Sequence, residues 1–135
     1  MLTEELDRSR LAQLSTLTLA HVGDGVFELL ARTHAAVQGE SRVDNMHRAT
    51  VRMVSAPAQA RAAEAILPML TPEEADVYRR GRNAKPKTAP ARATLAEYSR
   101  ATGLEALFGM LYLSGQAERI LQLWEAVLRA QEEAE

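Results

Sequence analysis

Two acidic residues lie inside apolar segments of this chain, where a charge is costly unless it has a partner. Asp24 stands in "LAHVGDGVFELLAR" (19–32), between two glycines, and Glu105 stands in "TGLEALFGMLYL" (102–113). A buried carboxylate must be protonated, paired with a base or bound to a cation. If both segments are helices packed face to face, the two acids can share one metal ion, as inward-facing acids of helical bundles do. The alternative is that each acid caps a neighbour, pairs with an arginine or accepts a hydrogen bond from a tyrosine or serine.

The residue types available restrict which metal such a site would hold. The chain contains no cysteine, which excludes disulfides and thiolate metal sites. Oxygen ligands alone favour Mg²⁺, with Mn²⁺ as an alternative, over zinc. Glu28 follows Asp24 by one helical turn on the same face, so we expect it to assist metal binding through water. The alternative for Glu28 is an ion pair with an arginine.

A basic segment stands apart from the rest of the chain. The stretch "RRGRNAKPKTAPAR" (79–92) has six basic residues and no acid, so it leaves −8 on the rest of a chain whose net charge is −2. A basic patch on an acidic body indicates a local site for a polyanion. The alternative is a solvated loop that merely lacks acids.

The elements that must position these residues are helices. Apolar residues recur at helical spacing, β-branched residues are sparse, and 47% hydrophobic with 25% charged residues is typical of a globular protein. After a short lead-in at 3–13, the predicted helices are 15–38, 43–54, 55–69, 71–81, 94–113 and 116–132. Gly81 is expected to end its helix and 82–93 to form a loop.

The sequence therefore predicts a single all-α domain of six or seven helices over residues 1–135, with a flexible acidic tail at about 132–135. The N-terminus "MLTEELDRSR" has no apolar core of a signal peptide, and no segment is apolar over a membrane-spanning length. We expect a cytoplasmic protein without a membrane partner.

Five motifs in order carry a resemblance to a known family. "VGDGVFELL" and "TGLEALFGMLYL" resemble two signature helices of the ribonuclease III domain. "HRAT" (47–50), "VSAPAQA" (54–60) and "RRGRNAK" (79–85) are similar to motifs of its Mini-ribonuclease III subgroup, which has no double-stranded-RNA-binding domain. The resemblance runs from about residue 17 to 124.

This resemblance implies a ribonuclease III-type helical endonuclease domain and a metal-dependent reaction. The family uses Mg²⁺ to activate water against a phosphodiester of double-stranded RNA, leaving 5′-phosphate and 3′-hydroxyl ends. It works as a homodimer with one site for each strand. Carried over by motif, Asp24 and Glu105 are the catalytic, metal-binding acids.

The subgroup matures the precursor of large-subunit (23S) ribosomal RNA, so a stem of that precursor is the implied substrate. Whether a large-subunit ribosomal protein presents the RNA stays open. Basic and polar side chains would hold the duplex by its phosphates. The predicted RNA-binding residues are His47, Arg48, Gln59, Arg79, Arg80, Arg82, Asn83, Lys85 and Lys87.

The chain departs from the family at several positions near the site. Larger ribonuclease III enzymes have Glu where this chain has Ala20 and Asp where it has Thr102, although threonine there fits the subgroup. His21 and Phe27 stand where the subgroup has tyrosines, and Gly25 where it has alanine. We expect metal binding to rest on few carboxylates, with water and substrate phosphate as the other ligands.

Two other functions fit an all-α domain of this kind. One is a catalytically silent RNA-binding or ribosome-assembly module on the same fold, and the other is a helical adaptor with buried ion pairs. The presence of both Asp24 and Glu105 favours the enzyme over the first, and the basic segment favours it over the second.

Overall fold

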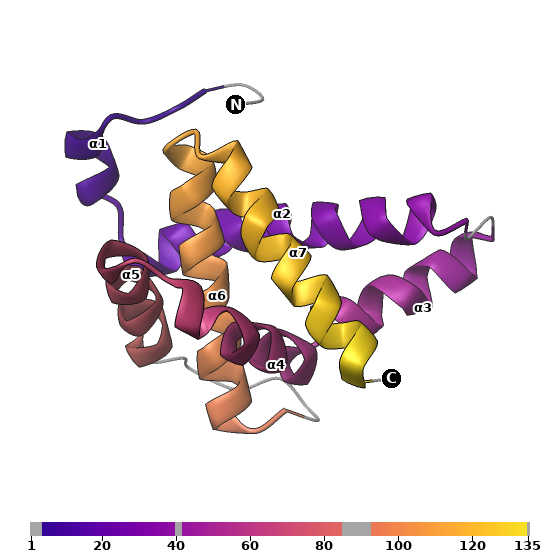
Figure 1. Ribbon diagram of the computed structural model, residues 1–135. Helices are drawn as coiled ribbons and strands as arrows, with labels where there is room; N and C mark the ends of the chain where they lie inside the picture. Colours follow the sequence, from indigo (N-terminus) through magenta and orange to yellow (C-terminus); the bar gives the residue numbers. More distant parts are fainter. Residues whose placement is uncertain (1–3, 40–41, 85–92, 135) are drawn as a thin grey trace.

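The computed structural model describes residues 4–39, 42–84 and 93–134. Within these ranges the chain forms helices and no strand, which confirms the predicted all-α fold. The helices, in chain order, are α1 (Arg8–Ala12), α2 (Thr16–Val37), α3 (Val43–Val54), α4 (Ala56–Ile66), the 3₁₀ helix η1 (Leu67–Met69), α5 (Pro72–Asn83), α6 (Leu95–Leu113) and α7 (Ala117–Ala134) (Figure 1). None of the helices among the described residues is long and apolar enough to span a membrane.

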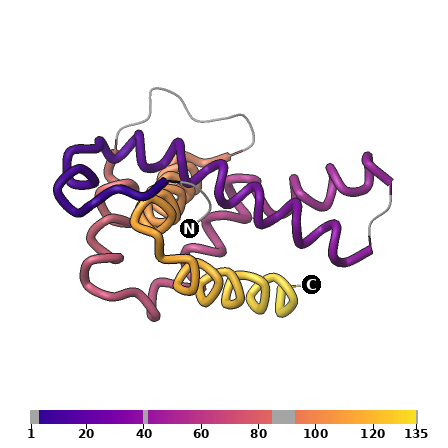
Figure 2. Tube along the Cα trace, turned by 90° about the horizontal axis from the view of Figure 1, so that it is seen from above, coloured from indigo at the N-terminus to yellow at the C-terminus, as the bar shows by residue number. Residues whose placement is uncertain are grey.

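Helix α6 is the centre of the arrangement. It packs against α2, α4 and α5, and α7 runs across the same bundle (Figure 1). Its side chains at Leu104, Leu107, Phe108 and Leu111 are all fully buried. A helix that is apolar on nearly every side belongs inside a bundle. From this core α2 extends outward and turns back as α3, and the pair projects to one side in both views (Figures 1 and 2).

Glycines allow α2 and α6 to touch backbone to backbone. A Cβ atom at Gly23 would lie 1.6 Å from the carbonyl oxygen of Glu105, and one at Gly109 would lie 1.9 Å from that of Leu19. Only glycine permits this approach, because any side chain would overlap the opposite backbone. The contact therefore fixes the residue after Gly23, which is Asp24, beside Glu105.

A second close contact explains an error in the predicted helix ends. Helix α5 does not end at Gly81 but continues to Asn83. Gly81 is buried against α6, where a Cβ atom would lie 2.8 Å from the Cα atom of Gly103. This glycine serves helix packing and not termination, so Arg82 and Asn83 belong to the helix and not to a loop.

The other predicted helix starts and ends agree with the structure to within a few residues. The side chains of Ser15, Ser55, Thr71 and Thr94 cap the N-termini of α2, α4, α5 and α6. Gly39 follows α2 with φ of +91°, a conformation that favours glycine.

A buried ion pair attaches α5 to α7. Arg119 donates from Nε and Nη2 to the two carboxylate oxygens of Glu74, both at 2.8 Å, and Nη2 also donates to the Met69 carbonyl at 2.7 Å. Burial raises the pKa of Glu74, but the hydrogen bonds from Arg119 and Thr71 outweigh it and leave the pKa below its ordinary value. The pair holds in place the helix whose end carries the basic residues.

Candidate active site

The acids predicted to share a site are in contact. Asp24 reaches the surface from α2, whereas the side chain of Glu105 on α6 is largely enclosed. Burial, a hydrogen bond with Asp24 and the charge of Asp24, in that order, raise the pKa of Glu105 to about 8. The Glu105 carboxyl group therefore stays mostly protonated near neutral pH, because its charged form would be buried and would lie beside the charge of Asp24. Such a pair is typical of a functional site.

Gln59 of α4 is the third polar side chain at this site. Its amide forms a hydrogen bond with the Glu105 carboxyl group that lowers the pKa of that acid, as an N–H donor to a carboxylate does. Gln59 is only 2% exposed. Its Oε1 is the one buried side-chain oxygen or nitrogen among the described residues that has no hydrogen-bond partner.

These donors fit a magnesium ion that keeps much of its water. A cation between Asp24 and Glu105 would remove their repulsion and allow both to be ionised. Across the described ranges no group of three or more His, Cys, Asp or Glu side chains is arranged to hold a metal. The site therefore does not fit a zinc centre or an all-protein calcium cage, both of which need more protein ligands.

Glu28, the third acid expected near the metal, has another partner, and Ala20 and Thr102, where larger ribonuclease III enzymes have acids, supply no carboxylate. Glu28 forms an ion pair with Arg32 at 3.1 Å, which is the alternative stated for it. Thr102 is buried, and its hydroxyl donates to the Tyr98 carbonyl at 3.0 Å within α6. Ala20 is buried and apolar. The carboxylates at the site are thus those of the contacting pair.

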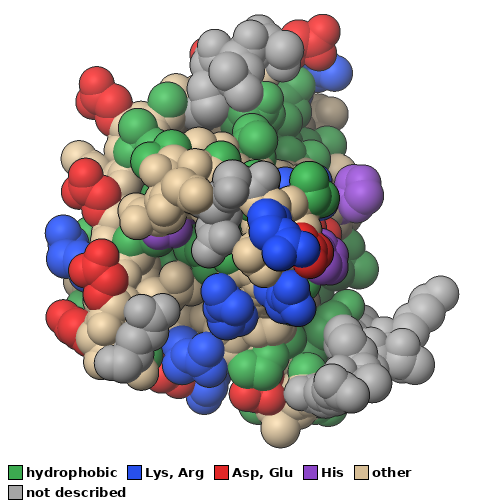
Figure 3. All heavy atoms as spheres, turned by 90° about the vertical axis from the view of Figure 1, so that its right-hand side faces the viewer, with side chains coloured by type: hydrophobic (Ala, Val, Ile, Leu, Met, Phe, Trp, Pro, Cys, Tyr) green, Lys and Arg blue, Asp and Glu red, His purple; other side chains and the backbone are tan. Residues whose placement is uncertain are grey.

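Two of the predicted RNA-binding residues lie on α3. His47 and Arg48 are both exposed. Arg48 contacts Asp44 at 3.4 Å and Asn45 at 3.1 Å on its own helix. Figure 3 faces the end of the molecule where α2 and α3 meet, and shows Arg side chains gathered beside hydrophobic ones.

The end of α5 brings together the other basic residues that were predicted to bind RNA and that the structure describes. Arg79 and Arg80 are exposed and both pair with one carboxylate, that of Asp76. The guanidinium of Arg82 lies 6.0 Å from the ring centre of Tyr78. Three guanidinium groups near one acid leave this surface positive, and exposed ion pairs are weak enough to be exchanged for phosphates. Asn83 is also exposed here, whereas Lys85 and Lys87 lie outside the described residues.

The position of Gln59 differs from the one expected from its motif. It was a candidate for RNA contact, but it lies in the core and faces Glu105, so its burial does not fit a direct contact with a duplex. The sequence carried only a weak signal for this position. Gln59 is a lone amide within an alanine-rich stretch of helix, and such an amide needs a hydrogen-bond partner if the face that carries it is buried.

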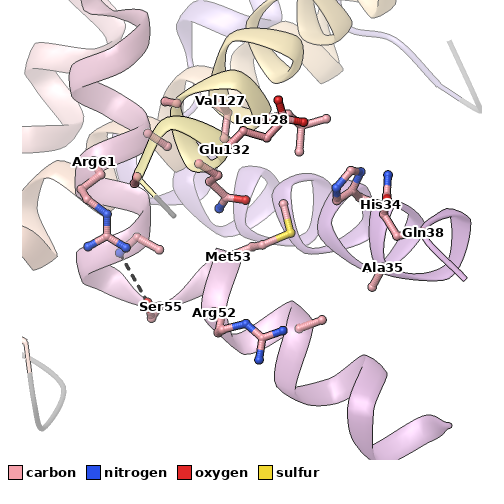
Figure 4. Close-up of a pocket in the computed structure, with 16 residues that line it drawn as sticks. His34, Ala35, Gln38, Arg52, Met53, Ser55, Arg61, Val127, Leu128 and Glu132 are labelled. Atoms are coloured by element: carbon pink, nitrogen blue, oxygen red, sulfur yellow. Dashed lines mark hydrogen bonds between the residues drawn. The ribbon is translucent and has the colours of Figure 1, made fainter. Parts of the chain in front are cut away.

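A cleft that the sequence did not indicate lies on another side of the molecule. It is bounded by α2, α3, α4 and α7, with His34, Arg52, Arg61 and Glu132 among the side chains around it (Figure 4). Neither acid of the contacting pair lines this cleft.

Comparisons with known proteins agree with the motifs. The model of the ribonuclease III domain matches residues 17–116. A Mini-ribonuclease 3 of Symbiobacterium thermophilum is 48% identical over 113 residues, covering 84% of this chain and 87% of that protein. A Mini-ribonuclease 3 of a Thermoanaerobacter species is 41% identical over 131 residues, covering 97% and 92%.

A solved structure also shares the fold. The crystal structure of a Fusobacterium nucleatum protein aligns with a TM-score of 0.80 and 29% identity, over 88% of this chain and 95% of that one. The family match covers more than half of the chain and includes both acids of the contacting pair. This chain therefore belongs to the ribonuclease III family and is an endoribonuclease.

Proposed function

We propose that this endoribonuclease cleaves double-stranded RNA in a Mg²⁺-dependent reaction at Asp24 and Glu105. The observation that carries the proposal is the contact between these two acids, with the pKa of Glu105 raised to about 8. A divalent cation bound between these two carboxyl groups would offset their repulsion and favour the ionised form of Glu105.

The reaction is a hydrolysis at phosphorus. Magnesium, when bound, supplies an activated water and offsets the negative charge that develops on the phosphate. In this hydrolysis a water oxygen would form a bond to phosphorus while the bond from phosphorus to the 3′ oxygen breaks. The proton released by the water would balance the proton taken up by the 3′ oxygen. The products are a 5′-phosphate and a 3′-hydroxyl end.

The residues of the chain hold the reacting groups in place. Asp24 is exposed, so a substrate can reach it, and Glu105 would give up its proton when a cation is bound. The backbone contact at Gly23 keeps the two carboxyl groups together. Such fixed placement matters, because an error of about 1 Å can cost about 100-fold in rate.

We further propose that the end of α5 binds the phosphates of the duplex. Arg79, Arg80 and Arg82 form its positive surface, and their weak contacts with Asp76 and Tyr78 do not compete strongly with phosphate. An A-form duplex is recognised mainly through its shape and phosphates, which suits guanidinium groups. For Lys85 and Lys87, which lie outside the described residues, phosphate binding is proposed from their motif alone.

The active form is proposed to be a homodimer with one site for each strand. Support comes from exposed apolar side chains on the projecting pair of helices: Leu29 and Val37 on α2 are 55% and 75% exposed, and Val43 and Val51 on α3 are 81% and 46% exposed. Clusters of this kind mark protein interfaces. Light scattering should give a mass near twice 14.8 kDa, and a monomer mass would contradict the proposal.

The proposed substrate is a stem of the large-subunit ribosomal RNA precursor, on the basis of the Mini-ribonuclease III motifs. The test is incubation of the purified protein and Mg²⁺ with this stem and with an unrelated duplex of equal length. Preferred cleavage of the precursor stem supports the assignment. Equal cleavage of both duplexes would contradict the proposed substrate, although the protein would still be a nuclease that cleaves double-stranded RNA.

A further inference from the structure

We propose that Gln59 is a positioning residue of the metal site, a role that rests on the proposed function. Its amide N–H holds the Glu105 carboxyl group, and its Oε1 accepts a hydrogen bond from water that enters with the cation. This assigns to Gln59 a part in metal binding and not in direct RNA contact.

The first observation is the unpartnered oxygen. Gln59 is 2% exposed, and its Oε1 has no partner in the described part of the chain. Buried side-chain oxygens in proteins nearly always accept a hydrogen bond from protein or water. The Oε1 atom therefore needs a donor from outside the protein, and water is the smallest group that supplies one.

The second observation is the surroundings of Gln59 on α4. Its neighbours Ala58, Ala60, Ala62 and Ala63 are all buried. A methionine of similar length would fill the same space without an unsatisfied oxygen, and Glu105 would still keep Asp24 as a hydrogen-bond partner, so stability without metal does not require an amide at this position. The chain keeps an amide there at a cost, as proteins do where function requires it.

The third observation is the direction of the side chain. The Gln59 amide bonds to Glu105, which itself contacts Asp24. Groups that hold a metal-binding carboxylate by hydrogen bonds orient it and raise affinity for the ion. Gln59 stands in this relation to Glu105, and it comes from a third helix, α4, so α2, α4 and α6 together form the site.

The test compares Gln59→Met with a matched control, Gln131→Met, which makes the same change on α7 away from the two acids. The probe is Mn²⁺ alone, titrated calorimetrically into the protein without RNA. Thermal unfolding is recorded without metal, and the Mg²⁺ dependence of cleavage is recorded separately. Gln59→Met is expected to weaken Mn²⁺ binding by about 10- to 100-fold, and to raise the Mg²⁺ concentration for half-maximal cleavage accordingly. Its unfolding temperature without metal should equal or exceed that of the wild type.

Two results would overturn the inference. Unchanged Mn²⁺ affinity in Gln59→Met shows that the amide has no part in the metal site. A lowered unfolding temperature without metal shows that it is a structural residue. The proposed function is tested apart from this by Asp24→Asn: if wild type and Asp24→Asn cleave RNA alike, the site itself is wrongly assigned, and Gln59 loses its role with it.

Discussion

Substitution of the two glycines that flank Asp24 should have opposite effects on stability. A Cβ atom at Gly23 would lie 1.6 Å from the Glu105 carbonyl oxygen, where ordinary contact begins at 3.4 Å. The two helices would have to separate by about 1.8 Å to accept alanine without overlap. A Cβ atom at Gly25 meets nothing within 4 Å.

The expected magnitudes follow from these distances. Gly25→Ala should stabilise the protein by about 0.5–1 kcal/mol, because alanine is the better helix residue. The unfolding temperature should rise by about 2–4 °C for a chain of this size. Gly23→Ala gains the same helix preference but overpacks a backbone contact, which costs about 1–3 kcal/mol or more.

Thermal unfolding followed by circular dichroism measures both effects, and duplex cleavage under Mg²⁺ measures the consequence for the site. Gly23→Ala should lower the cleavage rate about 100-fold, because it moves Asp24 away from Glu105 by more than 1 Å. Gly25→Ala should remain active. If Gly23→Ala is as stable as Gly25→Ala, the backbone contact between α2 and α6 is wrong.

Further predictions concern the pH dependence of stability, proton release on metal binding, the ion pair of Glu74 with Arg119 and the salt dependence of RNA binding. The pKa of Glu105 is higher in the folded than in the unfolded protein, so the folded state binds more protons between pH 4.5 and about 8. Without metal, the free energy of unfolding should therefore fall as pH rises through this range. Denaturant unfolding of Glu105→Gln should not show this fall. Binding of Mg²⁺ at pH 7 should release roughly 0.9 proton from the carboxyl pair, measured by calorimetry in buffers of different ionisation enthalpy, and no release would contradict the raised pKa. Glu74 has the opposite shift and stabilises the fold above its unfolded pKa. Arg119→Met, which removes its charged hydrogen-bond partner, should cost about 1.5–3 kcal/mol at pH 7, and a loss under ~1 kcal/mol would show that the pair is not important. Arg82→Ala should weaken duplex binding and reduce the slope of log affinity against log salt by about 1; an unchanged slope in filter binding would remove Arg82 from the interface.

The sequence indicated that Asp24 and Glu105 could share a site if their helices packed face to face, because a charge in an apolar helix needs a partner. It left caps, ion pairs and other hydrogen bonds open, and the family resemblance favoured the pair. It did not predict the end of α5, since a glycine that ends a helix and one that packs against another helix look alike in sequence. Gly81 was predicted to end its helix, but it packs against α6 within a helix that continues to Asn83. Only the position of α6, and of Gly103 on it, distinguishes the two.

The role of Gln59 could not be settled from its motif. Whether an amide in an alanine-rich helix faces solvent or the core depends on which face of α4 packs against α6, and small residues on several faces give a weak pattern. The ion pair of Glu28 with Arg32 is different, because its spacing of four residues is visible in sequence. For Glu28 the sequence left two partners open, a metal reached through water and a nearby arginine, and the structure shows the ion pair with Arg32.

The most direct measurement of the central claim is cleavage of a defined RNA duplex by wild type, Asp24→Asn and Glu105→Gln over a Mg²⁺ titration, with Glu28→Gln as the control acid. Wild type and the control should cut the duplex only when Mg²⁺ is present and leave 5′-phosphate ends. Both site variants should be folded and inactive. Cleavage by Asp24→Asn at the wild-type rate, or cleavage by wild type without a divalent metal, would contradict the account.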